Sequence, residues 1–330
     1  MNRPRRIVWI DDNPSRETSA GSVQALLRVR VDFRNVKGQD LFDELGKILD
    51  GPIPFMVILD HILDKTAAPS NNVLRTGTPV AEALRNRWPA CPIVGVTAAK
   101  NRENIDAHEE AVYDELFSFQ DFSHAMPCLG PIARGFARLA QGITDSREFL
   151  EILKTPDEDT ERLTRVIPDD LKRNFRDTSF ASRAYAWVRR VLVQQPGFLY
   201  DQLWAATFLG IKCDSFDKVA SMFNPARYRG IFALPDSPRW WASSLAEILY
   251  GRCHAEPGKP SWLVGRNLPG TGPRDYSVCY ACKKLLPETV GFLDVISEQQ
   301  RPMHLRCTAP HPRFARQLFF AEARMMMGAN

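Results

Sequence analysis

The stretch Arg6-Ile7-Val8-Trp9-Ile10-Asp11-Asp12 decides the fold, because it is an apolar strand that ends on two carboxylates. Later apolar segments also end on polar residues: 55–59 on Asp60, 92–96 on Thr97 and 116–119 on Gln120. Continuous apolar runs are typical of buried parallel strands. Amphipathic helical patterns at 39–49 and 79–88 separate the strands, and a last helix is expected at 132–139. The sequence therefore predicts an α/β fold with a doubly wound parallel sheet.

Three carboxylates are expected to meet at one edge of this sheet. Ligands bind at the carboxyl ends of parallel strands, and Asp11, Asp12 and Asp60 all lie at such ends. Carboxylates that lie this close repel one another, so the pKa of at least one rises unless a cation neutralises the charge. Mg²⁺ takes hard oxygen ligands of this kind. The sequence predicts a magnesium site here, although Asp12 before Asn13-Pro14 also suits a helix cap.

The order and spacing of these segments resemble the receiver domains of two-component response regulators. The resemblance covers residues 1–143 and implies a flavodoxin-like, five-stranded doubly wound sheet. It implies that Asp60 is the phosphoacceptor in a phosphorelay and that Asp11, Asp12 and Asp60 bind Mg²⁺. It further implies that Thr97 and Phe117 switch conformation, that a histidine kinase donates the phosphoryl group, and that the chain forms a homodimer.

One position departs from the receiver pattern. The family has a Lys, followed by Pro, at the end of the fifth strand, and the alignment puts Gln120 and Asp121 there. An amide forms hydrogen bonds but supplies no positive charge to a phosphoryl group. Two readings follow: a phosphoacceptor with Gln120 in the switch, and a pseudo-receiver used for docking or dimerisation.

A second metal site is indicated near the C-terminus by Cys279-x2-Cys282 and His304-x2-Cys307. Three thiolates and an imidazole in two such pairs suit tetrahedral, structural Zn²⁺. His311 competes with His304, but Pro310 and Pro312 restrict the backbone around it. With a helix expected at 313–327, the segment resembles treble-clef zinc fingers.

Composition sets the remaining bounds. The chain has 330 residues, 44% of them hydrophobic and 25% charged, which is typical of a globular protein with two or three domains. No apolar run approaches the roughly 20 residues that cross a bilayer, and no signal peptide is recognisable. Seven cysteines without an export signal argue against a disulfide framework. We therefore expect a cytoplasmic protein that does not enter membranes.

Four regions are expected: a receiver at 1–143, a linker with short helices at 144–177, a mainly helical domain at 178–250 and a zinc module at 251–330. In the helical domain, Trp240-Trp241 beside Arg239 suits either base stacking or a core. The adjacent Cys253-His254 pair is a weak signal for a nucleophile and base, because sequence neighbours point in different directions.

Charge indicates where an anionic partner would bind. Residues 251–330 hold 11 Lys and Arg against 6 Asp and Glu, whereas the rest of the chain is nearly balanced. Candidate nucleic-acid contacts around the zinc site are Lys283, Lys284, Arg306, Arg313 and Arg316.

These observations favour a response-regulator-like signalling protein whose degenerate receiver controls or docks a zinc-containing module that binds DNA or protein. A non-phosphorylated adaptor subunit is the alternative. An enzyme with an active site in 178–330 is less favoured, because no recognisable hydrolase, metalloprotease, P-loop or dinucleotide motif is present.

Overall fold

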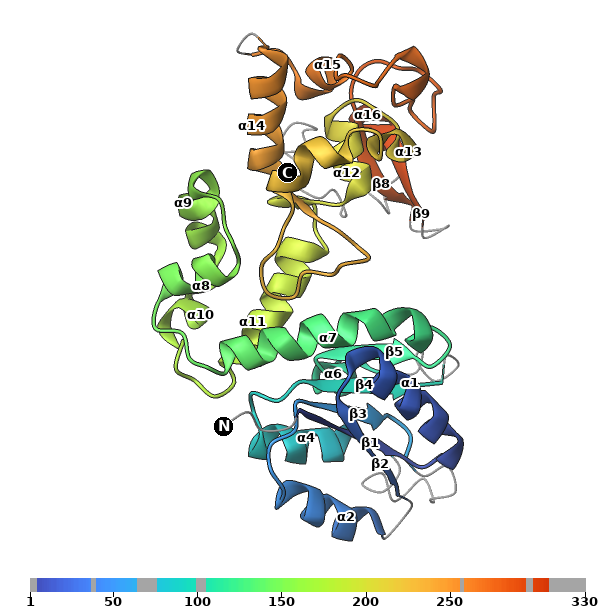
Figure 1. The fold of residues 1–330 in the computed structure, drawn as a ribbon, viewed down its shortest axis with the longest axis vertical. Helices are drawn as coiled ribbons and strands as arrows, with labels where there is room; N and C mark the ends of the chain where they lie inside the picture. Colours follow the sequence, from blue (N-terminus) through green and yellow to red (C-terminus); the bar gives the residue numbers. More distant parts are fainter. Residues whose placement is uncertain are drawn as a thin grey trace. The chain divides into compact units, whose positions relative to one another are not determined.

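The computed structural model describes residues 5–36, 40–63, 76–98, 105–255, 258–294 and 299–308 (Figure 1). The chain forms two compact units. The first unit comprises Met1–Phe149 and Pro168–Trp187, and the second comprises Leu150–Ile167 and Val188–Asn330. This packing divides the chain differently from the sequence-based boundaries at 143, 177 and 250, which stay a prediction about domains.

The first unit contains a five-stranded parallel sheet with the order β2-β1-β3-β4-β5. Its strands are β1 Arg6–Asp11, β2 Arg30–Asn35, β3 Met56–Asp60, β4 Ile93–Thr97 and β5 Glu115–Ser118. This order is that of the flavodoxin-like doubly wound folds, so the predicted fold class is confirmed. The strand order reverses at the β1–β3 pair, which places the carboxyl ends of these strands at the ligand-binding edge.

Helices cover both faces of this sheet (Figure 1). Helices α2 Asp40–Leu49 and α4 Thr78–Arg87 pack against one face, where apolar side chains of β1, β3 and β4 form a core with them. Helices α1 Glu17–Leu27 and α7 Phe122–Leu139 belong to the other face, on which Trp9 of β1 packs against Phe122. The short helix α6 Ala107–Ala111 precedes β5.

Helix α7 begins ten residues earlier than the predicted start at 132, because it runs through Pro127 and Pro131. Each proline removes a helix hydrogen bond and interrupts the sequence signal. Burial of one face, including Leu129, Ile132 and Phe136, outweighs that local cost.

A later segment completes the first unit. Helices α10 Asp169–Arg173 and α11 Phe180–Trp187 lie in the region predicted as linker and helical domain. The Arg85 guanidinium donates to Ser182 Oγ at 2.6 Å, and Tyr185 donates a hydrogen bond to Glu115. These bonds join α11 to the receiver-type sheet.

The second unit is mainly helical with two small antiparallel sheets. Helix α8 Ser146–Ile152 crosses the sequence boundary between the units. The described elements of the second unit are α9 Asp157–Val166, the π-helical turn Val188–Val193, β6 Leu199–Tyr200, α12 Gln202–Phe208, α13 Cys213–Phe216, the 3-10 turn Ala220–Ala226, β7 Trp240–Trp241, α14 Ala242–Cys253, α15 Ser261–Gly265, the 3-10 turn Pro273–Asp275, β8 Thr289–Asp294, β9 Gln299–His304 and α16 Leu305–Thr308. Its core is formed by apolar residues of α12, α13, α14 and α15. None of the described helices is long and apolar enough to span a bilayer.

The Trp240-Trp241 pair is buried, and Trp240 belongs to this core. The two side chains are 5% and 2% exposed. Their rings pack edge-on against Phe216 and Tyr228, at centroid distances of 4.9 and 5.7 Å. Burial decides between the two sequence readings, since a buried indole cannot stack on a base.

Candidate functional site

The first candidate site is the acid pocket, formed by Asp11, Asp12 and Asp60. Asp11 ends β1, Asp12 follows it, and Asp60 ends the adjacent strand β3. One carboxylate oxygen from each residue lies within 4.8 Å of the others. The predicted convergence of these carboxylates is confirmed.

Hydrogen bonds fix the orientation of Asp11, which is 1% exposed. The Trp9 indole donates to Oδ2 at 3.2 Å, and the Asn13 backbone N–H donates to Oδ1 at 2.9 Å. Burial raises the pKa of Asp11, and the two hydrogen bonds and the positive charge of Arg16 offset only part of that rise. A bound cation would stabilise the ionised form.

Asp11 and Asp60 open onto a small cavity of about 20 Å³ that Thr97, Arg16 and Phe119 also line. This is room for about one water-sized ligand. Thr97 ends β4 and is 1% exposed, and its Oγ1 has no hydrogen-bond partner among the described residues. A buried hydroxyl without a partner is costly, and a polar ligand in the cavity would satisfy it.

The residues of the acid pocket fit Mg²⁺. Oxygens around an octahedral Mg²⁺ lie about 2.9–4.2 Å apart, given Mg–O distances near 2.1 Å. The carboxylate oxygens lie within 4.8 Å of one another, so small side-chain rotations bring them to that spacing. The remaining positions suit water.

The end of β5 differs from the expected register. The strand ends at Ser118, which pairs with Thr97, whereas Gln120 lies two residues further on and is exposed. Ser118 Oγ is hydrogen bonded to Asp121, at the start of α7, and does not line the cavity. Phe117 is half-buried in β5, with its ring 6.4 Å from that of Phe122.

Arg16 supplies the positive charge at this site instead. It ends the 3-10 turn Pro14–Arg16, and among the described residues it is the single basic residue that lines the cavity. Its guanidinium carbon lies 3.0 Å from the centre of the Phe119 ring. Sequence reasoning missed both residues, because they lie 103 positions apart and carry no motif.

The second candidate site is the zinc cluster, formed by Cys279, Cys282, His304 and Cys307. Their ligand atoms lie within 4.8 Å of one another. His304 Nδ1 is 3.2 Å from Cys282 Sγ and 3.8 Å from Cys307 Sγ. Ligand atoms around tetrahedral Zn²⁺ lie about 3.5–3.8 Å apart, given Zn–S distances near 2.3 Å. The donor types and spacing fit zinc.

A tight turn brings Cys279 and Cys282 close together. The Lys283 backbone N–H donates to Cys279 O at 2.9 Å, and Lys283 adopts a left-handed conformation with φ of 58°. Burial raises the pKa of Cys279, but hydrogen bonds from the backbone N–H groups of Cys282, His304 and Ala281 together lower it by more than burial raises it. The pKa is therefore lower than that of a free cysteine, which favours the thiolate. Thiolate is the form that binds zinc.

The second pair lies at a strand–helix junction. His304 is the last residue of β9, and Cys307 lies in the first turn of α16. A short helix, α16, begins at Leu305, and the helix predicted at 313–327 lies outside the described residues. His311, Arg313 and Arg316 lie outside the described residues, whereas Lys283, Lys284 and Arg306 are exposed.

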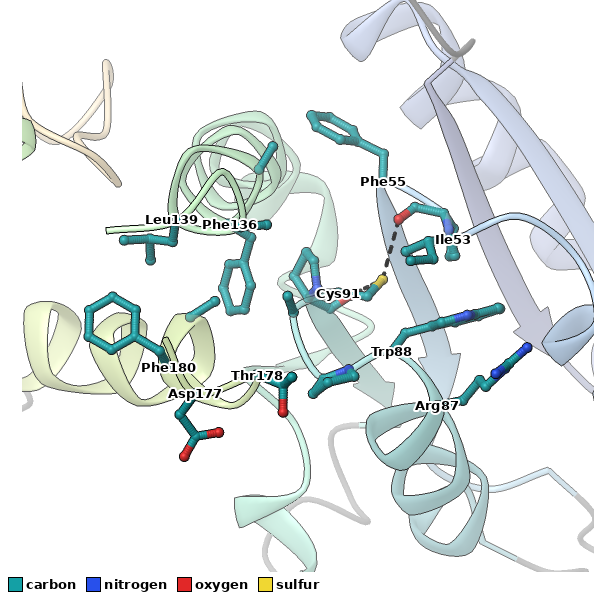
Figure 2. A pocket seen from close by; sticks show the side chains of 18 of the residues that line it. Ile53, Phe55, Arg87, Trp88, Cys91, Phe136, Leu139, Asp177, Thr178 and Phe180 are labelled. Carbon is teal, nitrogen blue, oxygen red and sulfur yellow. Dashed lines mark hydrogen bonds between the residues drawn. The ribbon is translucent and has the colours of Figure 1, made fainter. Parts of the chain in front are cut away.

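Two other cysteine signals do not form reactive sites. Burial raises the pKa of the Cys253 thiol, and no hydrogen bond joins it to His254 within the described part of the chain. In the first unit, Cys91 lies at an apolar cavity of about 560 Å³ at the amino ends of β3 and β4, where it contacts Pro54 O (Figure 2). Burial raises its pKa to about 12, so this thiol is not a nucleophile at neutral pH.

Comparison with known proteins adds only structural likeness. No protein-family model matches the chain, and no curated protein matches it. A response regulator from Thermotoga maritima, solved with Mg²⁺ and BeF, is 22% identical over 38% of this chain and 98% of its own, with a TM-score of 0.28. A receiver domain from Rhodospirillum rubrum is 16% identical over 38% and 90%, with a TM-score of 0.29. An adenylate cyclase from Rhodopirellula baltica is 13% identical over 50% and 100%, with a TM-score of 0.28.

These values carry no argument about activity. The fold assignment depends instead on the strand order and parallel register of this chain. The first unit has a receiver fold.

Proposed function

We propose that the chain is a response-regulator-like signalling protein in which Asp60 accepts a phosphoryl group and the zinc-containing second unit binds a partner. The observation that carries this proposal is the acid pocket, where three carboxylates meet beside the unpartnered, buried hydroxyl of Thr97. A hydroxyl at that place is able to donate to a phosphoryl oxygen.

In the proposed reaction, an Asp60 carboxylate oxygen attacks the phosphorus of a phosphohistidine or acetyl phosphate. A P–O bond forms as the bond to the leaving imidazole or acetate breaks, which gives an acyl phosphate. Bound Mg²⁺ would neutralise charge on the transferring group. Asp11, Asp12 and Asp60 would hold the metal, and Thr97 would orient one phosphoryl oxygen.

Arg16 takes the place of the missing strand lysine in this proposal. Neither Ser118 nor Gln120 provides a cation at the pocket, whereas Arg16 lines it from the β1 side and is held over the Phe119 ring. Cation–π contacts of this type stabilise by roughly 0.5–1 kcal/mol at exposed sites. In this proposal Phe119, and not Gln120 or Phe117, changes conformation on phosphorylation, because it contacts the Arg16 guanidinium and lines the cavity.

The test is intact mass after incubation with Mg²⁺ and acetyl phosphate, for the wild type and for Asp60→Asn. We expect one phosphoryl adduct on the wild type and none on the variant. Asp121→Asn is the matched control, because its carboxylate accepts a hydrogen bond from Ser118 Oγ and lies outside the cavity. An adduct that persists on Asp60→Asn would refute the acceptor assignment.

The alternative is a non-phosphorylated adaptor, which the small size of the cavity favours. A volume of about 20 Å³ is less than a phosphoryl group requires, so Phe119 or Arg16 has to move for phosphorylation. Absence of an adduct under conditions that label an authentic receiver would support the adaptor.

The partner surface of the second unit surrounds the zinc cluster. Tyr280 is 48% exposed, with Lys283 Nζ at 4.3 Å and the Arg301 guanidinium at 3.9 Å from its ring centre. Cations beside an exposed aromatic ring suit nucleic acid, whereas the neighbouring exposed Leu285 and Leu286 suit a protein. A steep salt dependence of DNA binding, lessened in Lys283→Ala/Lys284→Ala, would assign DNA as the partner. Its absence would leave a protein.

A further inference from the structure

A cavity in the second unit combines aromatic walls with one carboxylate. Its volume is about 320 Å³, within the range of small-molecule sites. Four aromatic side chains line it together with one acid: Tyr200, Trp204, Phe208, Trp262 and Glu288. They come from the β6–α12 segment, from α15 and from the residue before β8.

The aromatic rings of β6 and α12 form a fixed cluster. The Tyr200 ring centre lies 6.0 Å from that of Trp204 and 5.7 Å from that of Phe208. Trp204 and Phe208 are one helical turn apart, and the Asp201 carboxylate accepts the Trp204 backbone N–H at 2.8 Å, which fixes the start of α12. All three rings are half-buried. Aromatic faces carry negative potential and attract cations.

The charge of the cavity is also negative. Glu288 is exposed and forms no ion pair with any described residue. No Lys or Arg is among the described residues that line the cavity. Besides Glu288, its polar side-chain groups are the hydroxyls of Tyr200, Thr207, Ser261 and Thr289 and the indole N–H groups of Trp204 and Trp262. Arg266 does not line the cavity, but its guanidinium lies 4.8 Å from the Trp262 ring centre. The Trp262 indole therefore already makes a cation–π contact.

We propose that this aromatic cavity binds a small alkylammonium compound, a quaternary or tertiary amine the size of choline. The rings contact the alkyl groups, and Glu288 neutralises the positive charge. Apolar walls favour an alkylated ammonium over a strongly hydrated inorganic cation, because less hydration is lost on entry. This inference is independent of phosphorylation at Asp60.

The test is calorimetric titration of the full chain with choline and with 3,3-dimethylbutan-1-ol, which has the same shape without the charge. We expect choline to bind, and we expect the affinity for the neutral compound to be at least about tenfold lower. Equal affinity for the two compounds would overturn the proposal, since it would show an apolar cavity without cation preference. Absence of choline binding would overturn it too.

Two variants test the carboxylate. Glu288→Gln should weaken choline binding about tenfold and leave binding of the neutral alcohol unchanged. Glu247→Gln, an exposed carboxylate on α14 outside the cavity, should change neither. Because the charge of Glu288 acts on His304, zinc content is measured on both variants. A Glu288→Gln protein with full zinc and unchanged choline affinity would refute the electrostatic argument.

A third ligand distinguishes a free compound from a modified protein. A peptide with one trimethyllysine carries the same cationic group. Affinity for choline equal to or greater than that for the peptide supports the small-molecule assignment. Peptide binding more than about tenfold tighter would overturn it in favour of a methylated protein partner.

Discussion

Replacement of Arg16 by Gln should have opposite effects on the two ligands of the acid pocket. The Arg16 side chain lines the cavity onto which Asp11 and Asp60 open, and its charge lowers the pKa of Asp11. Its loss removes repulsion toward Mg²⁺ but also removes the cation that stabilises a transferring phosphoryl group. We therefore expect tighter Mg²⁺ binding and slower phosphorylation.

The magnitudes follow from the partial exposure of Arg16. Repulsion between a unit charge and a divalent ion several ångströms away in a water-like dielectric is roughly 1 kcal/mol, which corresponds to about fivefold in Mg²⁺ affinity. A hydrogen bond to a charged group contributes about 1.5–3 kcal/mol, so phosphorylation should slow by about 10- to 100-fold. Phe119→Leu, which removes only the ring under Arg16, should slow it by about two- to fivefold.

Mg²⁺ affinity is measured by calorimetry and by tryptophan fluorescence, because the Trp9 indole donates to Asp11. Phosphorylation rate is measured by intact mass with acetyl phosphate. Arg30→Gln, an exposed arginine at the amino end of β2, is the matched control. Ser118→Lys in the Arg16→Gln background should restore much of the rate, since it returns an ammonium to the strand end.

Unchanged Mg²⁺ affinity in Arg16→Gln would refute the placement of Arg16 at the metal. Tighter Mg²⁺ binding with an unchanged phosphorylation rate would refute only its role in transfer. The two readouts therefore separate an error in geometry from an error in mechanism.

Three further predictions concern the rest of the chain. Cys282→Ser should weaken zinc binding by about a hundredfold or more, because one of four ligands contributes its share of a binding free energy of roughly 10–16 kcal/mol. Chelator competition measures this affinity. Cys213→Ser, which lies outside the cluster, should not change it. Arg85→Met should lower the free energy of unfolding by about 3–5 kcal/mol, because it removes the guanidinium that lies 2.6 Å from the Asp114 carboxylate, a side chain only 4% exposed. Urea titrations measure the change, with a substitution of the exposed Arg87, Arg87→Met, as the control. Equal unfolding midpoints for the two variants would contradict the prediction. Burial lowers the pKa of His61 below 6.5, so the unfolded chain takes up the proton first and stability should fall as pH drops below 6.5; urea midpoints across this range should show a smaller fall in His61→Gln.

The sequence alone was sufficient for the parallel sheet and its acidic edge. Strands β1, β3 and β4 are continuous apolar runs, since both faces are covered by helices. It did not locate β2, whose sequence Arg30-Val31-Asp32-Phe33-Arg34 alternates as an edge strand does. The start of α7 was also missed, because two prolines interrupt its pattern.

The sequence by itself thus determined the functional groups that occur in local patterns. These are carboxylates at the ends of strands and two pairs of Cys or His ligands with two residues between the members of each pair. What only the tertiary structure decided is which distant residues complete each site. Arg16 and Phe119 at the acid pocket, and Glu288 beside the Trp204 and Trp262 rings, are brought together by chain packing. Local periodicity is a property of neighbouring residues, whereas these contacts depend on how α12, α15 and the loops pack, which no short sequence pattern records.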